Sequence, residues 1–162
     1  MLAYAVLKGL IERYREANQA PILKRAGEIF SRITLGAYAR LKTEETDKGQ
    51  VILVAVAADG EEKRVEQLSD GTRDQLYLAL RLATYERLNE AGRALPLILD
   101  DILVNCDDPR AEATLGVLAE VAHDAQILFF THHDHMTALA RKAIPADVLS
   151  EHILLGPIAI AV

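Results

Sequence analysis

The chain has 162 residues, a length that suits one compact domain with its own hydrophobic core. Its formal net charge is −6 and it has no long run of like charge, which argues against a strong nucleic-acid clamp, because such clamps need clustered lysine and arginine. The single cysteine, Cys106, excludes an internal disulfide and fits a reducing compartment. No apolar stretch is long enough to cross a membrane and no signal peptide is evident, so we expect a cytoplasmic protein without a membrane partner.

The first part of the chain is predicted to be helical. Apolar residues recur over residues 2–19 with the alternating spacing of a coiled-coil seam, which is equally typical of an amphipathic helix packed on the domain. Pro21 predicts a break, and a second helix is expected over residues 23–33. We therefore divide the chain into a coiled-coil stub over residues 1–20 and a globular lobe over residues 21–162.

The middle of the chain changes to a strand pattern. Strands are predicted over residues 38–42, 51–56 and 63–66, with turns at residues 47–49 and 59–60. This arrangement predicts a small antiparallel β patch.

Apolar runs and helical patterns then alternate. Helices are expected over residues 72–91, 109–122 and 134–142, and buried strands over residues 96–99, 126–130 and 152–155. The first of these helices is expected to carry Leu76, Leu80, Ala83 and Leu88 on one face. The alternation predicts an α/β fold, a layered and mostly parallel sheet flanked by helices, with right-handed crossovers.

Polar residues follow two of the predicted buried strands. Asp100 and Asp101 end the first strand, and Thr131 and His132 end the second. Ligands of open α/β sheets bind outside the carboxyl ends of the strands. Adjacent acids suit Mg²⁺, with one acid holding the metal while its neighbour orients a water, and the histidine could reach the same phosphate. The alternative is that the two acids only cap the following segment.

A short polar segment, residues 69–72, precedes the long helix. Its Ser-Asp-Gly-Thr sequence places a hydroxyl and free backbone N–H groups at a helix N-terminus, where an anion is favoured. An ordinary N-cap is the alternative interpretation.

In this order, the motifs resemble the C-terminal half of the P-loop ABC-type ATPase head of SMC, RecN and RecF proteins. Residues 68–72 match the signature motif, residues 97–101 the Walker B strand, residues 105–107 the D-loop, and residues 131–132 the switch histidine. The sequence of the long helix and of residues 97–108 is most similar to bacterial YhaN-like SMC-type ATPases. The resemblance covers residues 22–142.

The resemblance implies a role for each residue at the strand ends. Asp100 would hold Mg²⁺ and Asp101 would polarise the attacking water. His132 would contact the γ-phosphate of ATP. The family usually has glutamate where this chain has Asp101, so the resemblance implies slow hydrolysis.

The resemblance also implies contacts across a pair of heads. Ser69, Gly71 and Thr72 belong to the motif that would grip the γ-phosphate bound on the opposing head, and Asp107 would communicate across the dimer. Asp70 replaces the first glycine of the family pattern, and we expect its side chain to point away from the phosphate as a helix cap.

A phosphate-binding P-loop is missing from the sequence, because no Gly-Lys dipeptide occurs. In SMC-like proteins that loop lies in an N-terminal lobe beyond a coiled coil. The resemblance therefore implies an N-terminal Walker A lobe and a second ATPase head as partners, with ATP and Mg²⁺ as cofactors that require that lobe, and predicts that the isolated chain is inactive. The parent protein is expected to serve DNA repair or maintenance, beside a phosphoesterase or nuclease subunit.

Two alternatives stay open. A stand-alone metal-dependent phosphohydrolase could use two metals held by a cluster of acids and histidines. That cluster comprises Asp100, Asp101, Asp107, Asp108, His132, His133, Asp134 and His135. His133 and His135 are better explained as surface polar residues at a helix start. The other alternative is a structural lobe without activity that serves dimerisation or coil anchoring.

Overall fold

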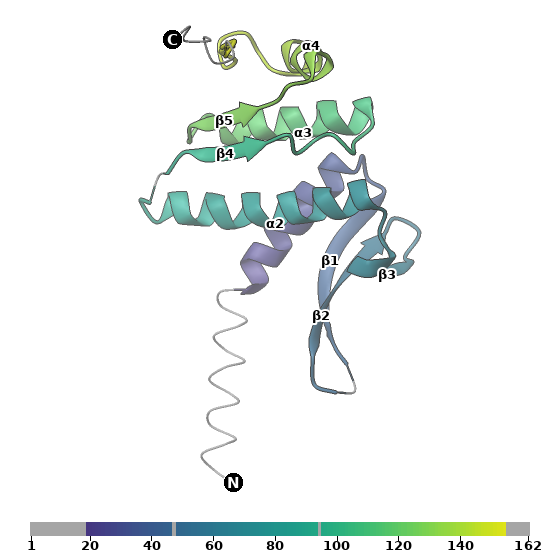
Figure 1. The fold of residues 1–162 in the computed structure, drawn as a ribbon. Coiled ribbons are helices and arrows are strands. Elements are labelled where there is room, and N and C mark those ends of the chain that lie inside the picture. The colour runs from purple at the N-terminus through teal and green to yellow at the C-terminus, as the bar shows by residue number, and fades with distance from the viewer. Residues whose placement is uncertain (1–18, 47, 94, 155–162) are drawn as a thin grey trace, which may run out of the picture.

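A computed structural model describes residues 19–154 apart from residues 47 and 94 (Figure 1). Residues 1–18 of the predicted coiled-coil stub, which was placed over residues 1–20, lie outside this range. After a helix over residues 19–33, the elements are β1 (Tyr38–Glu45), β2 (Val51–Ala57), β3 (Glu62–Arg64), the 3₁₀ turn η1 (Val65–Gln67), α2 (Asp70–Glu90), β4 (Leu97–Asp100), α3 (Asp108–Val121), β5 (Ile127–Phe130) and α4 (Asp134–Ala143). Among these described helices none is long and apolar enough to cross a membrane.

The helix over residues 19–33 runs through Pro21, so the predicted break there is wrong. Its buried face explains why the helix persists: Ile29, Phe30 and Ile33 are fully buried in the main core. Proline removes one N–H donor, and the burial of this apolar face outweighs that loss.

The antiparallel β patch is confirmed. The three strands pair in the order β1-β2-β3, and Leu41 of β1 lies opposite Ala55 of β2. Both residues are buried in the main core, where the ring of Tyr38 packs 5.0 Å from that of Phe30. The third strand ends earlier than predicted because Arg64 passes directly into η1.

The long helix α2 buries Leu76 and Ala83 of the four residues predicted to share one face, but not Leu80 and Leu88. Its buried residues recur three and four positions apart, as in an amphipathic helix, and comprise Thr72, Gln75, Leu76, Leu78, Ala79, Leu82 and Ala83. Leu88 is exposed and Leu80 is only half-buried. The buried residues therefore end at Ala83, whereas the predicted face continued to Leu88.

The predicted α/β arrangement is present at the parallel pair of β4 and β5. The two strands are joined through α3, which lies behind them in Figure 1. One face of the pair packs Leu99 into the core, whereas the other face exposes Ile98, Leu128 and Phe130. The strands were predicted to be buried on both sides, and the structure shows that only one side is covered within the described chain.

The predicted strand over residues 152–155 is wrong where the structure describes it. Residues 152–154 have no strand pairing, and the side chains of Ile153 and Leu154 are exposed. An apolar run forms a strand only where a neighbouring strand can accept its backbone hydrogen bonds, and these residues lie beside none. Leu155 lies outside the described residues.

Candidate phosphate and nucleotide site

The ends of β4 and β5 bring an aspartate and a histidine together. Asp101 Oδ2 lies 2.5 Å from His132 Nδ1, and the Thr131 hydroxyl donates to Asp101 Oδ1 at 2.8 Å. The Asp101 backbone N–H also donates to the carbonyl of Phe130 at 3.0 Å, which continues the strand pairing to this point. The expected proximity of the two strand ends is confirmed for this pair.

Asp101 has an unusual backbone and a perturbed carboxyl group. Its φ is 48°, in the left-handed region that non-glycine residues seldom occupy and that aspartate tolerates better than most. The hydrogen bond from Thr131, assisted by the charge of His132, holds the pKa of the Asp101 carboxyl below its usual range. The carboxylate therefore stays ionised at neutral pH.

Asp100 faces a different direction from Leu99. It is exposed and lies in register with Phe130, on the uncovered side of the parallel pair. Within the described chain its carboxylate has no hydrogen-bond partner, so both oxygens are available to a ligand. Free carboxylate oxygens at an exposed strand end fit the ligands that Mg²⁺ prefers.

A second group of predicted site residues surrounds an open pocket of about 380 Å³. The pocket is lined by Ser69, Asp70, Gly71, Thr72, Gln75, Asn105, Cys106, Asp107 and Arg110. The start of α2 forms one wall, and the loop before α3 forms the other. The structure thus brings the signature-like and D-loop-like residues together.

The start of α2 is capped by Ser69. The Ser69 hydroxyl accepts from the Thr72 backbone N–H at 3.4 Å and lies 2.8 Å from the Thr72 hydroxyl. Asp70 is not the cap that we expected, because it is the first residue of the helix, and its carboxylate pairs with Arg73 at 2.5 Å. The N-cap interpretation of this segment is confirmed, and the backbone N–H groups of the first helical residues have no partner within the helix.

Gly71 packs against the backbone of the loop before α3. A Cβ atom on Gly71 would collide with the carbonyl oxygen of Asn105. The Asn105 side chain in turn donates to Asp74 Oδ2 at 3.0 Å. The absence of a side chain at Gly71 therefore allows this loop to lie directly on α2.

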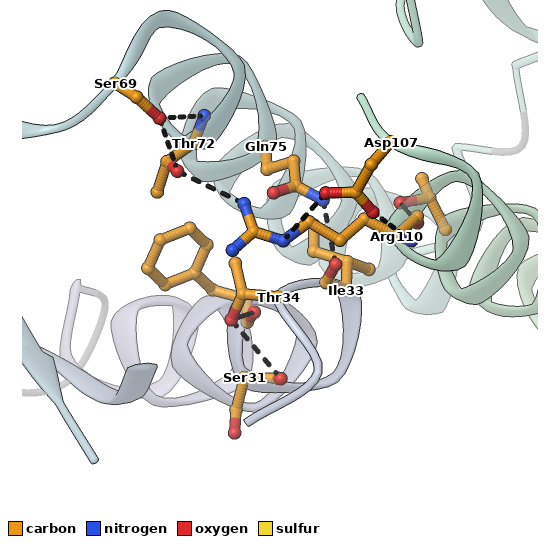
Figure 2. A network of polar contacts seen from close by, with 10 residues as sticks. Ser31, Ile33, Thr34, Ser69, Thr72, Gln75, Asp107 and Arg110 are labelled. Carbon is orange, nitrogen blue, oxygen red and sulfur yellow. Dashed lines mark hydrogen bonds and ion pairs between the residues drawn. The ribbon is translucent and has the colours of Figure 1, made fainter. Parts of the chain in front are cut away.

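Arg110 connects the two walls of the pocket, and sequence reasoning missed it (Figure 2). Its guanidinium donates to the Thr72 hydroxyl at 3.4 Å and lies 3.7 Å from Asp107 Oδ2. Asp107 is the N-cap of α3 and accepts from the Arg110 backbone N–H at 3.0 Å. The spacing of three residues between Asp107 and Arg110 could have predicted their pairing, but nothing in the sequence indicates the contact with Thr72.

Gln75 is a buried member of the same network of polar contacts (Figure 2). It is 1% exposed, and its Nε2 donates to the carbonyl of Ile33 at 2.8 Å. Its Oε1 has no partner among the described residues. The bond to Ile33 ties the pocket to the end of the first helix.

The larger acid and histidine cluster of the phosphohydrolase alternative does not assemble as a whole. Only Asp101, His132 and His133 come within reach of one ion in the part of the chain that the structure covers. Asp108 and His135 form a separate exposed pair at 2.8 Å. A two-metal centre is therefore absent from these residues.

Comparisons with known proteins give several sequence relatives, while no protein-family model matches. The chain is 35% identical over 133 residues to the uncharacterized protein YhaN of Bacillus subtilis, covering 81% of the chain and 13% of that protein. It is 33% identical over 110 residues to the DNA double-strand break repair Rad50 ATPase of Sulfurisphaera tokodaii, covering 67% of the chain and 12% of that protein. The chain thus spans a small part of the length of these relatives.

Solved structures with the same fold are SMC ATPase heads. One, from work on the ATP-driven dimerization and DNA-stimulated activation of SMC ATPases, has a TM-score of 0.64 at 22% identity and covers 79% of this chain and 77% of that one. An SMC head bound to the C-terminal winged-helix domain of ScpA has a TM-score of 0.59 at 26% identity, covering 75% of this chain and 37% of that one. The chain is accordingly part of an SMC-like ATPase head, with YhaN among its homologues.

Proposed function

We propose that the chain supplies the Walker B and signature half of an SMC-type ATPase head. It completes a MgATP site together with a Walker A lobe of the same parent, and it drives dimerisation with a second head. The observation that carries this proposal is the contact between Asp101 and His132 at the converging strand ends. The parent then acts in the cytoplasm in DNA repair or maintenance, beside a phosphoesterase or nuclease subunit, and the Rad50 relative supports this role.

The Asp101 side chain is suited to orient a water. Its carboxylate is ionised and held in place by Thr131 and His132, and each carboxylate oxygen has a further lone pair for a water proton. His132, when protonated, donates through Nδ1 to Asp101 and can donate through Nε2 to a phosphate oxygen. Mg²⁺ held by Asp100 would polarise the phosphate and neutralise its charge.

The pocket at the start of α2 suits the phosphate of an opposing head. The N–H groups of Asp70 and Gly71, which have no partner among the described residues, lie at the positive end of a 21-residue helix, beside the Ser69 hydroxyl. Interactions made only with the triphosphate favour the dimer over separate heads. Asp107 is linked to Thr72, at the start of α2, through the side chain of Arg110.

The uncovered face of β4 and β5 supports a partner lobe. Ile98 is 62% exposed, and Leu128 and Phe130 lie beside it on the same side. A parallel sheet is stable when both of its faces are covered, and here one is not. We assign this face to the Walker A lobe of the parent, whose homologues are several times longer than this chain.

The test is Asp101→Asn in the full-length parent. We expect turnover to fall at least about 100-fold, the range for loss of a catalytic base, while MgATP affinity stays unchanged. Asp124→Asn is the matched control, because Asp124 is an exposed acid at the end of α3 that is not part of either site. Wild-type turnover in Asp101→Asn would refute the proposal.

A second experiment separates the ATPase from the alternatives. The isolated chain should not bind MgATP tightly, and mixing it with the Walker A lobe should restore ATP hydrolysis. Hydrolysis of phosphate esters by the chain alone would favour the phosphohydrolase. A folded mixture without ATPase activity would favour a structural lobe.

A further inference from the structure

Three metal-ligating side chains converge at the strand ends. Asp101, His132 and His133 each offer a ligand atom, and these atoms lie within 4.8 Å of one another. The two imidazole rings, from consecutive residues, lie 3.9 Å apart at an angle of 38°. Consecutive side chains of an extended strand point to opposite sides, so the backbone after β5 must turn to bring both rings to Asp101.

Thr131 positions this group through two hydrogen bonds of its hydroxyl. The Thr131 hydroxyl donates to Asp101 Oδ1, and its oxygen (Thr131 Oγ1) accepts from the His133 backbone N–H at 3.2 Å. Asp101 Oδ2 remains directed at His132. Metal ligands are commonly oriented by such a second set of hydrogen bonds, which fixes the ligand before the ion arrives.

His133 contributes to none of the interactions proposed for ATP hydrolysis. Its ring lies tilted against that of His132, and its nitrogens have no hydrogen-bond partner in the described part of the chain. Two imidazole nitrogens and one carboxylate form a ligand set typical of Zn²⁺, Co²⁺ or Ni²⁺, whereas Mg²⁺ prefers oxygen ligands alone. The composition of the group therefore selects a transition metal.

The geometry is close to what such an ion requires. Zinc ligands at about 2.0–2.1 Å lie roughly 3.3 Å apart around a tetrahedral ion, so the Asp101 and His132 atoms, which lie 2.5 Å apart, must separate by about an ångström to admit one. The side chain of His132 is 76% exposed, which leaves room for this movement. Three protein ligands leave the fourth position to water.

We propose that Asp101, His132 and His133 form a binding site for a transition-metal dication such as Zn²⁺. An ion bound there takes Asp101 and His132 as ligands, so neither side chain remains available to a nucleotide. Occupancy would therefore inhibit hydrolysis, and this consequence rests on the proposed ATPase function. The metal binding itself does not.

Binding is tested on the full 162-residue chain with Co²⁺ and Zn²⁺, by calorimetry and by the visible absorption of bound Co²⁺. We expect one ion per chain, and at least a 10-fold loss of affinity in His133→Ala, the range seen when metal-site residues are removed. His123→Ala is the matched control, since His123 is an exposed histidine outside the site. His135→Ala tests the Asp108–His135 pair. The proposal is overturned if neither ion binds, or if His133→Ala binds like the unaltered chain.

Inhibition is tested on the full-length parent with Mg²⁺ in excess. Micromolar Zn²⁺ should lower ATP turnover, and a chelator should restore it. Turnover of His133→Ala is compared with its own value in the absence of Zn²⁺, and this variant should lose its sensitivity to Zn²⁺. Equal sensitivity of both proteins would overturn the inhibitory role, whereas a parent without any ATPase activity would refute the proposed function and leave the binding result standing.

Discussion

Gly71 and Asn105 meet at a point where the chain has no room for one more carbon atom. The Cα of the glycine, in the first turn of α2, faces the carbonyl oxygen of the asparagine in the loop before α3. The contact holds the two walls of the pocket against each other. It also assigns to Gly71 a packing role beside the phosphate-binding role that the sequence resemblance implies.

Gly71→Ala is therefore expected to destabilise the fold by about 1–3 kcal/mol, the usual cost of overpacking, because a rigid backbone atom must move. Gly116→Ala in α3 provides the matched comparison, since no atom lies within 4 Å of the position that its Cβ would take. That substitution should stabilise the chain by up to about 1 kcal/mol through the higher helix propensity of alanine. Urea unfolding of both variants measures the difference, and equal effects would contradict the packing argument.

Arg110→Gln should uncouple the two walls of the pocket without unfolding them. It removes the ion pair with Asp107 and the hydrogen bond to Thr72. In the full-length parent we expect ATP-dependent head dimerisation to weaken about 10-fold, since a hydrogen bond to a charged group contributes roughly 1.5–3 kcal/mol. Arg141→Gln, which removes an exposed pair with Glu151, should leave dimerisation unchanged. Crosslinking or light scattering with MgATP reads out both variants.

The first helix is joined to α2 by a bidentate ion pair. Arg25 donates to both carboxylate oxygens of Glu86, at 2.6 and 2.8 Å, and this contact raises the pKa of Arg25. A double-mutant cycle with Arg25→Ala and Glu86→Ala should give a coupling free energy of about 1 kcal/mol, the upper end for partly exposed pairs. A coupling near zero would show that the pair contributes nothing to stability. Thermal unfolding of the four proteins gives the value.

A second ion pair makes stability depend on pH in the acid range. Two hydrogen bonds from Arg32 lower the pKa of Glu120 below its usual value of about 4.3. Because the folded-state pKa is the lower one, the stabilisation is complete above the unfolded pKa and is lost as the pH falls through the folded value. Glu120→Gln should cost about 0.2–1 kcal/mol at pH 7, and the difference from the unaltered chain should vanish in stronger acid. A constant difference at all pH values would contradict this assignment.

The uncovered face of the parallel pair should make the isolated chain self-associate. Ile98 and Phe130 expose adjoining apolar surface next to strand edges, a combination that favours non-specific association. Ile98→Thr should lower the average molar mass of the isolated chain, measured by sedimentation, toward that of the monomer. In the full-length parent the same substitution should weaken docking of the Walker A lobe and reduce turnover. Tyr77→Thr, at another exposed apolar position, is the control for both measurements.

The elements that could be predicted from sequence are those with a strong local pattern. The parallel strands, their polar ends and the helices between them follow from periodicity over a few residues, and a shared sheet edge then brings Asp101 to His132. Contacts between distant segments could not be predicted. Arg110 reaches Thr72 across 38 positions, and no local pattern encodes that distance. Neither could the sequence show which face of a four-residue strand stays open, because both faces of β4 carry apolar residues.

The positive φ of Asp101 affects which acidic residue fits at this position. A positive φ costs most side chains about 1–2 kcal/mol, and aspartate occupies this region more readily than most other residues that carry a side chain. A longer acid in place of Asp101 would meet the same main-chain torsion, and its carboxylate would lie one methylene further from the backbone that now directs it to Thr131 and His132. The shape of the chain at this one residue therefore favours the shorter acid, independently of how fast the protein turns over.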